Sequence, residues 1–167
     1  MKKNFFILII ALLFQMIFYS CEREEVIVDN NPIIGTWIYE SSEAGEIETN
    51  SEKNSVLIKP YVVKRGEYWF KGLKYEFKPY GYFESSRNGG SPLQATYTFS
   101  NGTLSATVIG GPTQSIKAKI NYGLLIMEHN VTNDCNEIKL SDLNELGIED
   151  INFKTIKAIV IIKFRKQ

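Results

Sequence analysis

The chain is short of the residues from which most metal and catalytic sites are built. Its 167 residues include one histidine and two cysteines, too few for the Cys and His ligand sets of a zinc site. The pairs Gly89-Gly90 and Gly110-Gly111 lie among turn residues and do not form a phosphate loop. The acidic residues between 142 and 150 lack the spaced oxygen ligands of a calcium loop. We therefore predict no metal, no cofactor and no enzymatic activity.

An excess of charge of either sign is also missing. Lys plus Arg and Asp plus Glu both number 19, so the formal net charge at pH 7 is zero. Proteins that hold nucleic acid or an anionic membrane surface by charge carry a basic patch or stripe. The charge balance gives no such footprint, and we predict no nucleic-acid partner.

Thiol and imidazole chemistry is limited to three side chains. The cysteines are Cys21 and Cys135, and the histidine is His129. We interpret Cys135 as a small buried residue or a tolerated loop thiol rather than a nucleophile. We interpret His129, which follows Glu128 near the end of an expected strand, as a surface residue.

What the chain does have is a distinctive first segment. Lys2 and Lys3 precede an uncharged, largely apolar run over residues 5–19, and Ser20-Cys21 follows. This order resembles a bacterial lipoprotein signal peptide over residues 1–20, and the resemblance implies that Cys21 is lipidated and becomes the first mature residue. The alternatives are an uncleaved anchor, which needs about 20 apolar residues, and plain secretion. Each of the three places the domain outside the cytoplasm.

Residues 21–32 are expected to form a flexible tether. Three of the four residues at 22–25 are glutamates, and such a cluster is usually a solvated segment. It also resembles the signal that sends Bacteroidetes lipoproteins to the outer leaflet of the outer membrane. The expected address is therefore the outer membrane, lipid-anchored, with the domain facing the periplasm or the cell surface.

Residues 33–167 have the length of a single domain and the pattern of an all-β fold. Short β-rich runs alternate with turn residues. Asn101-Gly102 between two such runs is a strong hairpin signal, because a type I′ turn needs positive φ at both central positions. The expected strands are 36–40, 54–59, 67–70, 73–78, 82–86, 94–100, 104–108, 116–120, 124–129 and 155–165.

Residues 142–146 do not follow this alternation of strands and turns, and we predict one short helix there, before the last strand. Ser141 precedes acidic residues, and Gly147 can end the helix. The middle of the last strand is apolar on both faces, which indicates cover on both sides. We expect the short helix to cover the outer face.

Three stretches resemble the lipocalin-like domains of the calycin superfamily. They are Ile34-Gly35-Thr36-Trp37, the aromatic hairpin at 75–83, and the hairpin at 97–104 with its Asn-Gly turn. The resemblance implies an antiparallel up-and-down barrel of about eight strands, with Trp37 closing its floor. No arginine is clearly placed to pack on Trp37.

The resemblance supports one function, and the residues leave others open. We expect a non-enzymatic domain that binds a small apolar or amphipathic molecule in the barrel mouth. The alternative is an interaction module of the cell envelope. Its barrel would be filled by its own aromatic side chains, and its contacts would be made by loops 39–54 or 87–92. The third hypothesis is a hydrolase with unrecognised carboxylates. The candidate ligand-binding residues are Trp37, Tyr75, Phe77, Tyr97 and Phe99.

Overall fold

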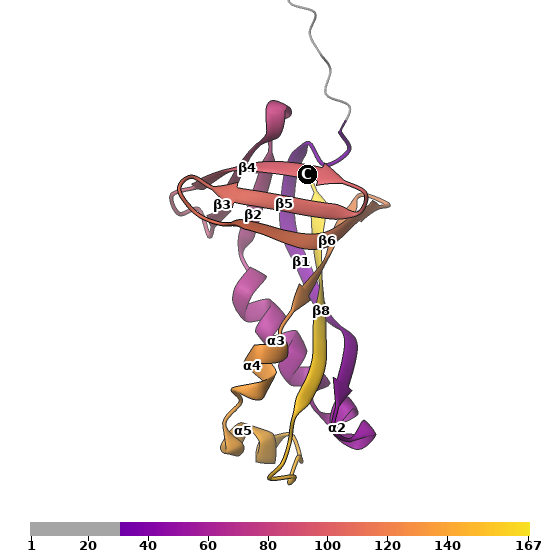
Figure 1. The fold of residues 1–167 in the computed structure, drawn as a ribbon. Coiled ribbons are helices and arrows are strands. Elements are labelled where there is room, and N and C mark those ends of the chain that lie inside the picture. Colours follow the sequence, from indigo (N-terminus) through magenta and orange to yellow (C-terminus); the bar gives the residue numbers. More distant parts are fainter. Residues whose placement is uncertain (1–30) are drawn as a thin grey trace, which may run out of the picture.

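The protein forms a closed barrel of eight antiparallel strands (Figure 1). The structure, a computed structural model, describes residues 31–167, so the predicted leader, Cys21 and most of the tether lie outside the described residues. Each strand pairs with the next along the chain, and β8 closes the barrel by pairing with β1. The predicted fold class, an up-and-down barrel, is confirmed.

The strands are β1 (Gly35–Thr49), β2 (Leu73–Phe77), β3 (Tyr82–Arg87), β4 (Leu93–Ser100), β5 (Thr103–Val108), β6 (Thr113–Asn121), β7 (Leu124–Asn130) and β8 (Thr155–Lys166). The helices are α2 (Glu52–Leu57), α3 (Lys59–Phe70), the 3₁₀ turn η1 (Pro79–Gly81), α4 (Thr132–Asn136) and α5 (Leu140–Glu145).

The turns between the middle strands follow the sequence signals closely. Asn101 has φ 50° and Gly102 has φ 73°, which are the two positive values that a type I′ hairpin needs. The predicted turn over residues 79–81 is η1, with Tyr80 in the left-handed region at φ 62°. The predicted hairpins β2–β3, β4–β5 and β6–β7 are therefore confirmed.

Two predicted strands are wrong, because residues 54–59 and 67–70 belong to helices α2 and α3. The local run Val56-Leu57-Ile58 is rich in β-forming residues and suggested a strand. The residues that follow have a helical spacing instead. Val62, Gly66 and Phe70 are spaced four apart and are the buried residues of α3, so they form one helical face. This face packs against β1 and β8. Packing on the barrel therefore outweighs the local β propensity.

Strand β1 is far longer than the predicted 36–40. It continues to Thr49 and pairs with β8 along most of its length, with register shifts near Ser41, Ile47 and Thr49. Such irregularities bend a strand and increase its twist, and they hide the alternation of side chains in the sequence. The predicted loop at 39–54 is consequently a strand as far as Thr49, followed by the start of α2.

Strands β1 and β8 extend beyond the part of the barrel formed by β3 to β6, and the helices lie against this extension (Figure 1). The predicted short helix before the last strand is present as α5, but α3 and α4 make the main helix contacts with β8. They cover the face that carries Ala158, Val160 and Ile162, all fully buried. On the other face Ile159 and Ile161 are half-buried and border a cavity. The expectation that the short helix covers the outer face of the last strand is therefore wrong, because the helices cover the inner face and the outer face borders the cavity.

Trp37 lies in the packed floor of the barrel, at the end where β1 begins. Its side chain is fully buried, and its indole Nε1 donates a hydrogen bond to the Ile33 carbonyl oxygen at 2.6 Å. The ammonium group of Lys166 lies 5.3 Å from the ring centroid, within the range of a cation–π contact. The cation that packs on this tryptophan is thus a lysine from the last strand.

Candidate functional site

A cavity of about 960 Å³ lies between the aromatic floor of the barrel and the C-terminal end of α3, and it is partly open to solvent. Small side chains leave this space, because Ser85, Ala95 and Ala106 face inward where larger residues would fill it. Phe70 of α3 closes the cavity on the helical side. The apolar lining consists of Phe70, Tyr75, Phe83, Leu93, Ala95, Leu104, Ala106, Val108, Pro112, Ile116, Met127, Ile159 and Ile161.

The cavity reaches the surface where β6 and β7 separate. β6 pairs with β7 only from Lys117 onward, while its first residues pair with β5 alone. His129 and Asn130 at the end of β7 pair only with β8. Residues on both sides of this opening, including Gln114 and Asn130, border the cavity. The barrel is therefore closed at its floor and open in its wall.

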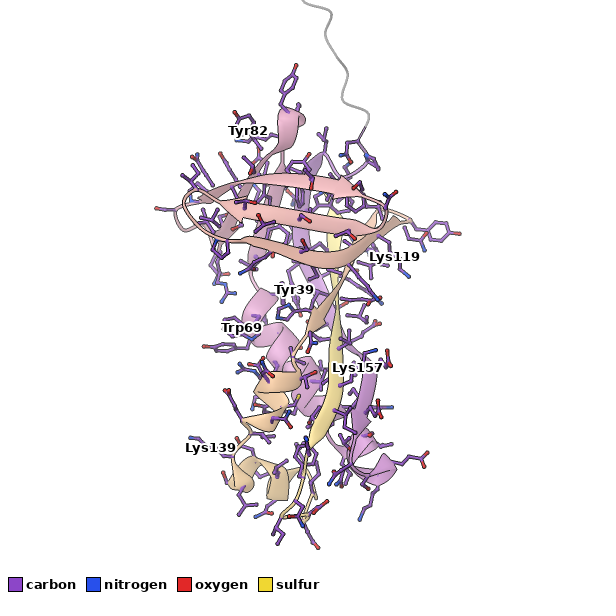
Figure 2. All side chains as sticks on the ribbon, viewed as in Figure 1. Tyr39, Trp69, Tyr82, Lys119, Lys139 and Lys157 are labelled. Carbon is purple, nitrogen blue, oxygen red and sulfur yellow. The ribbon has the colours of Figure 1, made fainter. Side chains whose placement is uncertain are left out.

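Charged side chains lie at this opening, whereas the interior is mainly apolar. Lys117 Nζ stands 3.7 Å from Glu128 Oε2, across the β6–β7 pair. Lys157 forms a second ion pair with Glu46, and Figure 2 labels Lys157 on the β8 ribbon. All four residues border the cavity. Exposed pairs of this kind contribute little to stability, and their charges remain available to a polar group at the opening.

His129 faces the barrel interior, and the prediction that it is a surface residue is wrong. It is half-buried and borders the cavity, with its ring 5.2 Å from that of Phe70 in an edge-to-face contact. Burial lowers the pKa of the imidazole, and the negative charge of Asp134 opposes this effect more weakly. The neutral imidazole is therefore favoured at pH 7.

We expect His129 to make the fold less stable in acid. Because its folded-state pKa lies below the ordinary 6.5, the unfolded chain binds more protons as the pH falls. The free energy of unfolding should drop from about pH 7.5 down to the folded pKa and then level off. In His129→Gln this component should disappear, as measured by urea unfolding across the pH range. The chain has no other histidine, so an equal slope in both proteins would contradict the assignment.

Tyr75 is the one predicted ligand-binding residue that borders the cavity. Its ring stacks on Phe164 with centroids 4.6 Å apart and meets Phe83 edge to face. Burial raises the pKa of its hydroxyl well above the ordinary value, with a weaker opposing effect from Arg87. No hydrogen bond joins this hydroxyl to another residue within 31–167, so it is a polar group available to a ligand.

The other four predicted residues lie outside the lining of the cavity. Phe77 stacks on Phe83 with centroids 4.8 Å apart and meets Tyr97 edge to face at 4.9 Å. The Tyr97 hydroxyl donates to the Lys78 carbonyl oxygen at 3.1 Å. Trp37 is fully buried, and Phe99 packs against the core. These residues form the floor on which the cavity rests.

The described part of the chain offers little for metal or thiol chemistry. Within residues 31–167 no three His, Cys, Asp or Glu side chains gather closely enough to hold a metal ion. Cys135 is fully buried, as one of its two predicted interpretations requires. Burial, followed by the charge of Asp134, raises the pKa of its thiol to about 12. A reactive cysteine has a lowered pKa and is accessible, so Cys135 has the properties of a structural residue.

None of the helices between residues 31 and 167 is long and apolar enough to cross a membrane. Comparisons with protein-family models, with curated proteins and with solved structures find no match for the chain. The function is therefore argued from the cavity and from the residues around it.

Proposed function

We propose that the protein is a lipoprotein of the outer membrane, anchored through Cys21, whose barrel binds one small apolar or amphipathic molecule without transforming it. The cavity of about 960 Å³ is the observation that carries the binding proposal. Ligand sites are usually pre-formed, mainly apolar and about 300–1,000 Å³ in volume. The cavity meets each of these conditions.

The distribution of polar groups favours an amphipathic molecule with its apolar part inside. The interior offers aromatic and aliphatic surface with isolated polar groups, among them the Tyr75 hydroxyl and the His129 imidazole. The ion pairs Lys117–Glu128 and Glu46–Lys157 lie at the opening. They present both signs of charge, so they can interact with a polar head of either sign.

The rival proposals have less support. An interaction module with a filled barrel needs the interior to be packed by its own side chains, and the cavity argues against that packing. A hydrolase needs carboxyl groups held in a shielded environment. The two carboxylates that border the cavity, Glu46 and Glu128, are exposed and each is paired with a lysine.

A large side chain placed in the cavity should weaken binding of an amphipathic probe. In Ala106→Phe a benzyl ring would replace a small inward side chain of β5, so dansylaminoundecanoic acid should bind at least about tenfold more weakly, roughly 1.4 kcal/mol. The matched control is Thr96→Phe, an exposed position of β4 that does not border the cavity. Fluorescence titration measures both affinities.

An Ala106→Phe affinity equal to that of Thr96→Phe would place the probe outside the barrel. Failure of the unmodified protein to bind the probe, and to retain any small molecule during gentle native mass spectrometry, would contradict the proposal itself.

A further inference from the structure

One end of the barrel is formed by short turns together with both termini of the domain. Gly35, the first residue of β1, pairs with Phe77 at the end of β2. The Gly123 carbonyl oxygen in the β6–β7 turn accepts a hydrogen bond from the Lys166 amide near the end of β8. In an up-and-down barrel the starts of odd strands and the ends of even strands lie at the same end. The tyrosine end, as we call it, consists of residues 31–35, 78–82, 100–103, 121–123 and 165–167.

Three tyrosines project from this end. Tyr122 is 95 % exposed, Tyr80 74 % and Tyr82 60 %, and Figure 2 shows Tyr82 at the end of the barrel where β1 begins. Single exposed apolar residues need no explanation, but here three large exposed rings lie on two turns at the same end of the barrel.

The backbone at two of these tyrosines is unfavourable for a bulky side chain. Tyr122-Gly123 has φ values of 47° and 75°, nearly those of Asn101-Gly102 in the neighbouring turn, 50° and 73°. Tyr80-Gly81 is similar, at 62° and 77°. Asparagine tolerates the left-handed region far better than a bulky residue does. The fold therefore carries strain to place tyrosine where asparagine would be easier, which points to a function for the rings.

The turn segments at this end carry basic residues only, and two of these residues pair with glutamates on the neighbouring strands. The segments of the tyrosine end contain Lys78, Arg165 and Lys166 and no Asp or Glu. Lys78 and Arg165 each pair with a glutamate that lies outside these segments. The turns themselves present aromatic rings and hydroxyls without a carboxylate, although the whole chain has equal numbers of acidic and basic residues.

We propose that the tyrosine end rests on the lipid headgroups of the membrane that anchors the protein. Tyrosine is enriched at membrane–water interfaces, where its ring lies at the level of the headgroups and its hydroxyl stays hydrated. The inference rests on the proposed anchor at Cys21. Nine residues lie between Cys21 and Asn31. The chain therefore takes ten steps of at most about 3.6 Å each, so the anchor holds this end within about 36 Å of the lipid.

This orientation turns the cavity away from the bilayer. Leu93 at the start of β4 and Val108 at the end of β5 border the cavity, and both lie at the end of their strands opposite the tyrosines. A ligand would therefore enter and leave on the aqueous side, and water-borne molecules rather than bilayer lipids are the class that the cavity receives.

Spin labels at the two ends of the barrel test the orientation. Ser100→Cys places a label at the tyrosine end and Ser141→Cys places one in α5, and both positions are exposed. Cys135 is fully buried and is not expected to react with the label. The full chain is purified from bacterial membranes and reconstituted in vesicles of phosphatidylethanolamine and phosphatidylglycerol. The label at 100 should become shielded from an aqueous nickel complex, relative to protein in detergent, and the label at 141 should not.

The double variant Tyr80→Asn/Tyr122→Asn shows whether the rings make the contact. It should be at least as stable as the parent, because asparagine suits both turns, and the shielding of the label at 100 should be lost. Equal accessibility of both labels in a vesicle-bound protein, or shielding that persists without the tyrosines, would overturn the proposal. Shielding seen only in native membranes would overturn it in favour of a protein partner. A chain that does not remain with the vesicles contradicts the anchor itself, and the orientation with it.

Discussion

Replacing Trp37 with alanine should lower the free energy of unfolding by about 3–5 kcal/mol, the usual cost of removing a large buried aromatic side chain. The tryptophan is fully buried in the floor, where the surrounding strands are fixed by the closed barrel and cannot collapse into the space. The change also leaves the Ile33 carbonyl oxygen without its donor at 2.6 Å and removes the ring beneath Lys166. Urea unfolding followed by circular dichroism measures the loss.

The second tryptophan of the chain supplies the control. Trp69 lies on the outer side of α3 (Figure 2) and is 44 % exposed, so Trp69→Ala should cost less than about 1 kcal/mol. Similar losses in the two variants would mean that the floor does not hold the barrel together. A selective loss in Trp37→Ala would show that this residue supports the fold of the barrel.

The sequence predicts the middle strands because each of them has one face in the barrel and one in solvent. Tyr97 and Phe99 of β4 alternate with exposed residues, and Asn101-Gly102 marks the turn directly. Helix α3 could be predicted only by weighing the spacing of Val62, Gly66 and Phe70 against the local β propensity of the preceding residues. The length of β1 has no comparable local signal, because its register shifts interrupt the alternation.

All five predicted binding residues lie on the inward face of the barrel, but only Tyr75 borders the cavity. Alternation tells which side chains point inward, and it does not tell how far along the barrel they lie. The large inward residues of β4 come late in the strand and fill the floor, whereas Ala95 comes early and leaves space. Ala106 in β5 and Ser85 in β3 do the same. In the sequence, small residues at inward positions indicate the cavity, and aromatic residues at inward positions indicate its floor.

The opening at β6 and β7 could not have been found from the sequence. Ile116 alternates correctly with its neighbours, yet β6 pairs with β7 only beyond it. The separation arises because β7 follows the long β8 toward the helices while β6 stays with β5. His129 consequently changes from an expected surface residue to a side chain of the cavity.

Replacing Gly66 with valine should separate α3 from the barrel. A Cβ atom at this position would lie 2.6 Å from Val160 Cγ2 and 2.8 Å from Ser42 Oγ, closer than non-bonded atoms can approach. Valine is a better helix former than glycine, so a net loss can come only from the close contact with β1 and β8. Overpacking of this kind costs about 1–3 kcal/mol, and we expect the upper part of that range because the neighbouring strands are fixed by their pairing.

The same variant connects the stability of α3 to the cavity. Phe70, one turn beyond Gly66, borders the cavity and packs against Phe164 and His129, so displacing the helix should weaken binding of the dansyl probe as well as lower the free energy of unfolding. Glu67→Val, at an exposed position of the same helix, introduces the same side chain without the contact and should change both quantities little. A Gly66→Val protein that unfolds more easily but binds the probe unchanged would show that α3 supports the barrel without shaping its cavity. If stability and probe binding are lost together, the close packing of α3 at Gly66 also sets the volume available to the ligand.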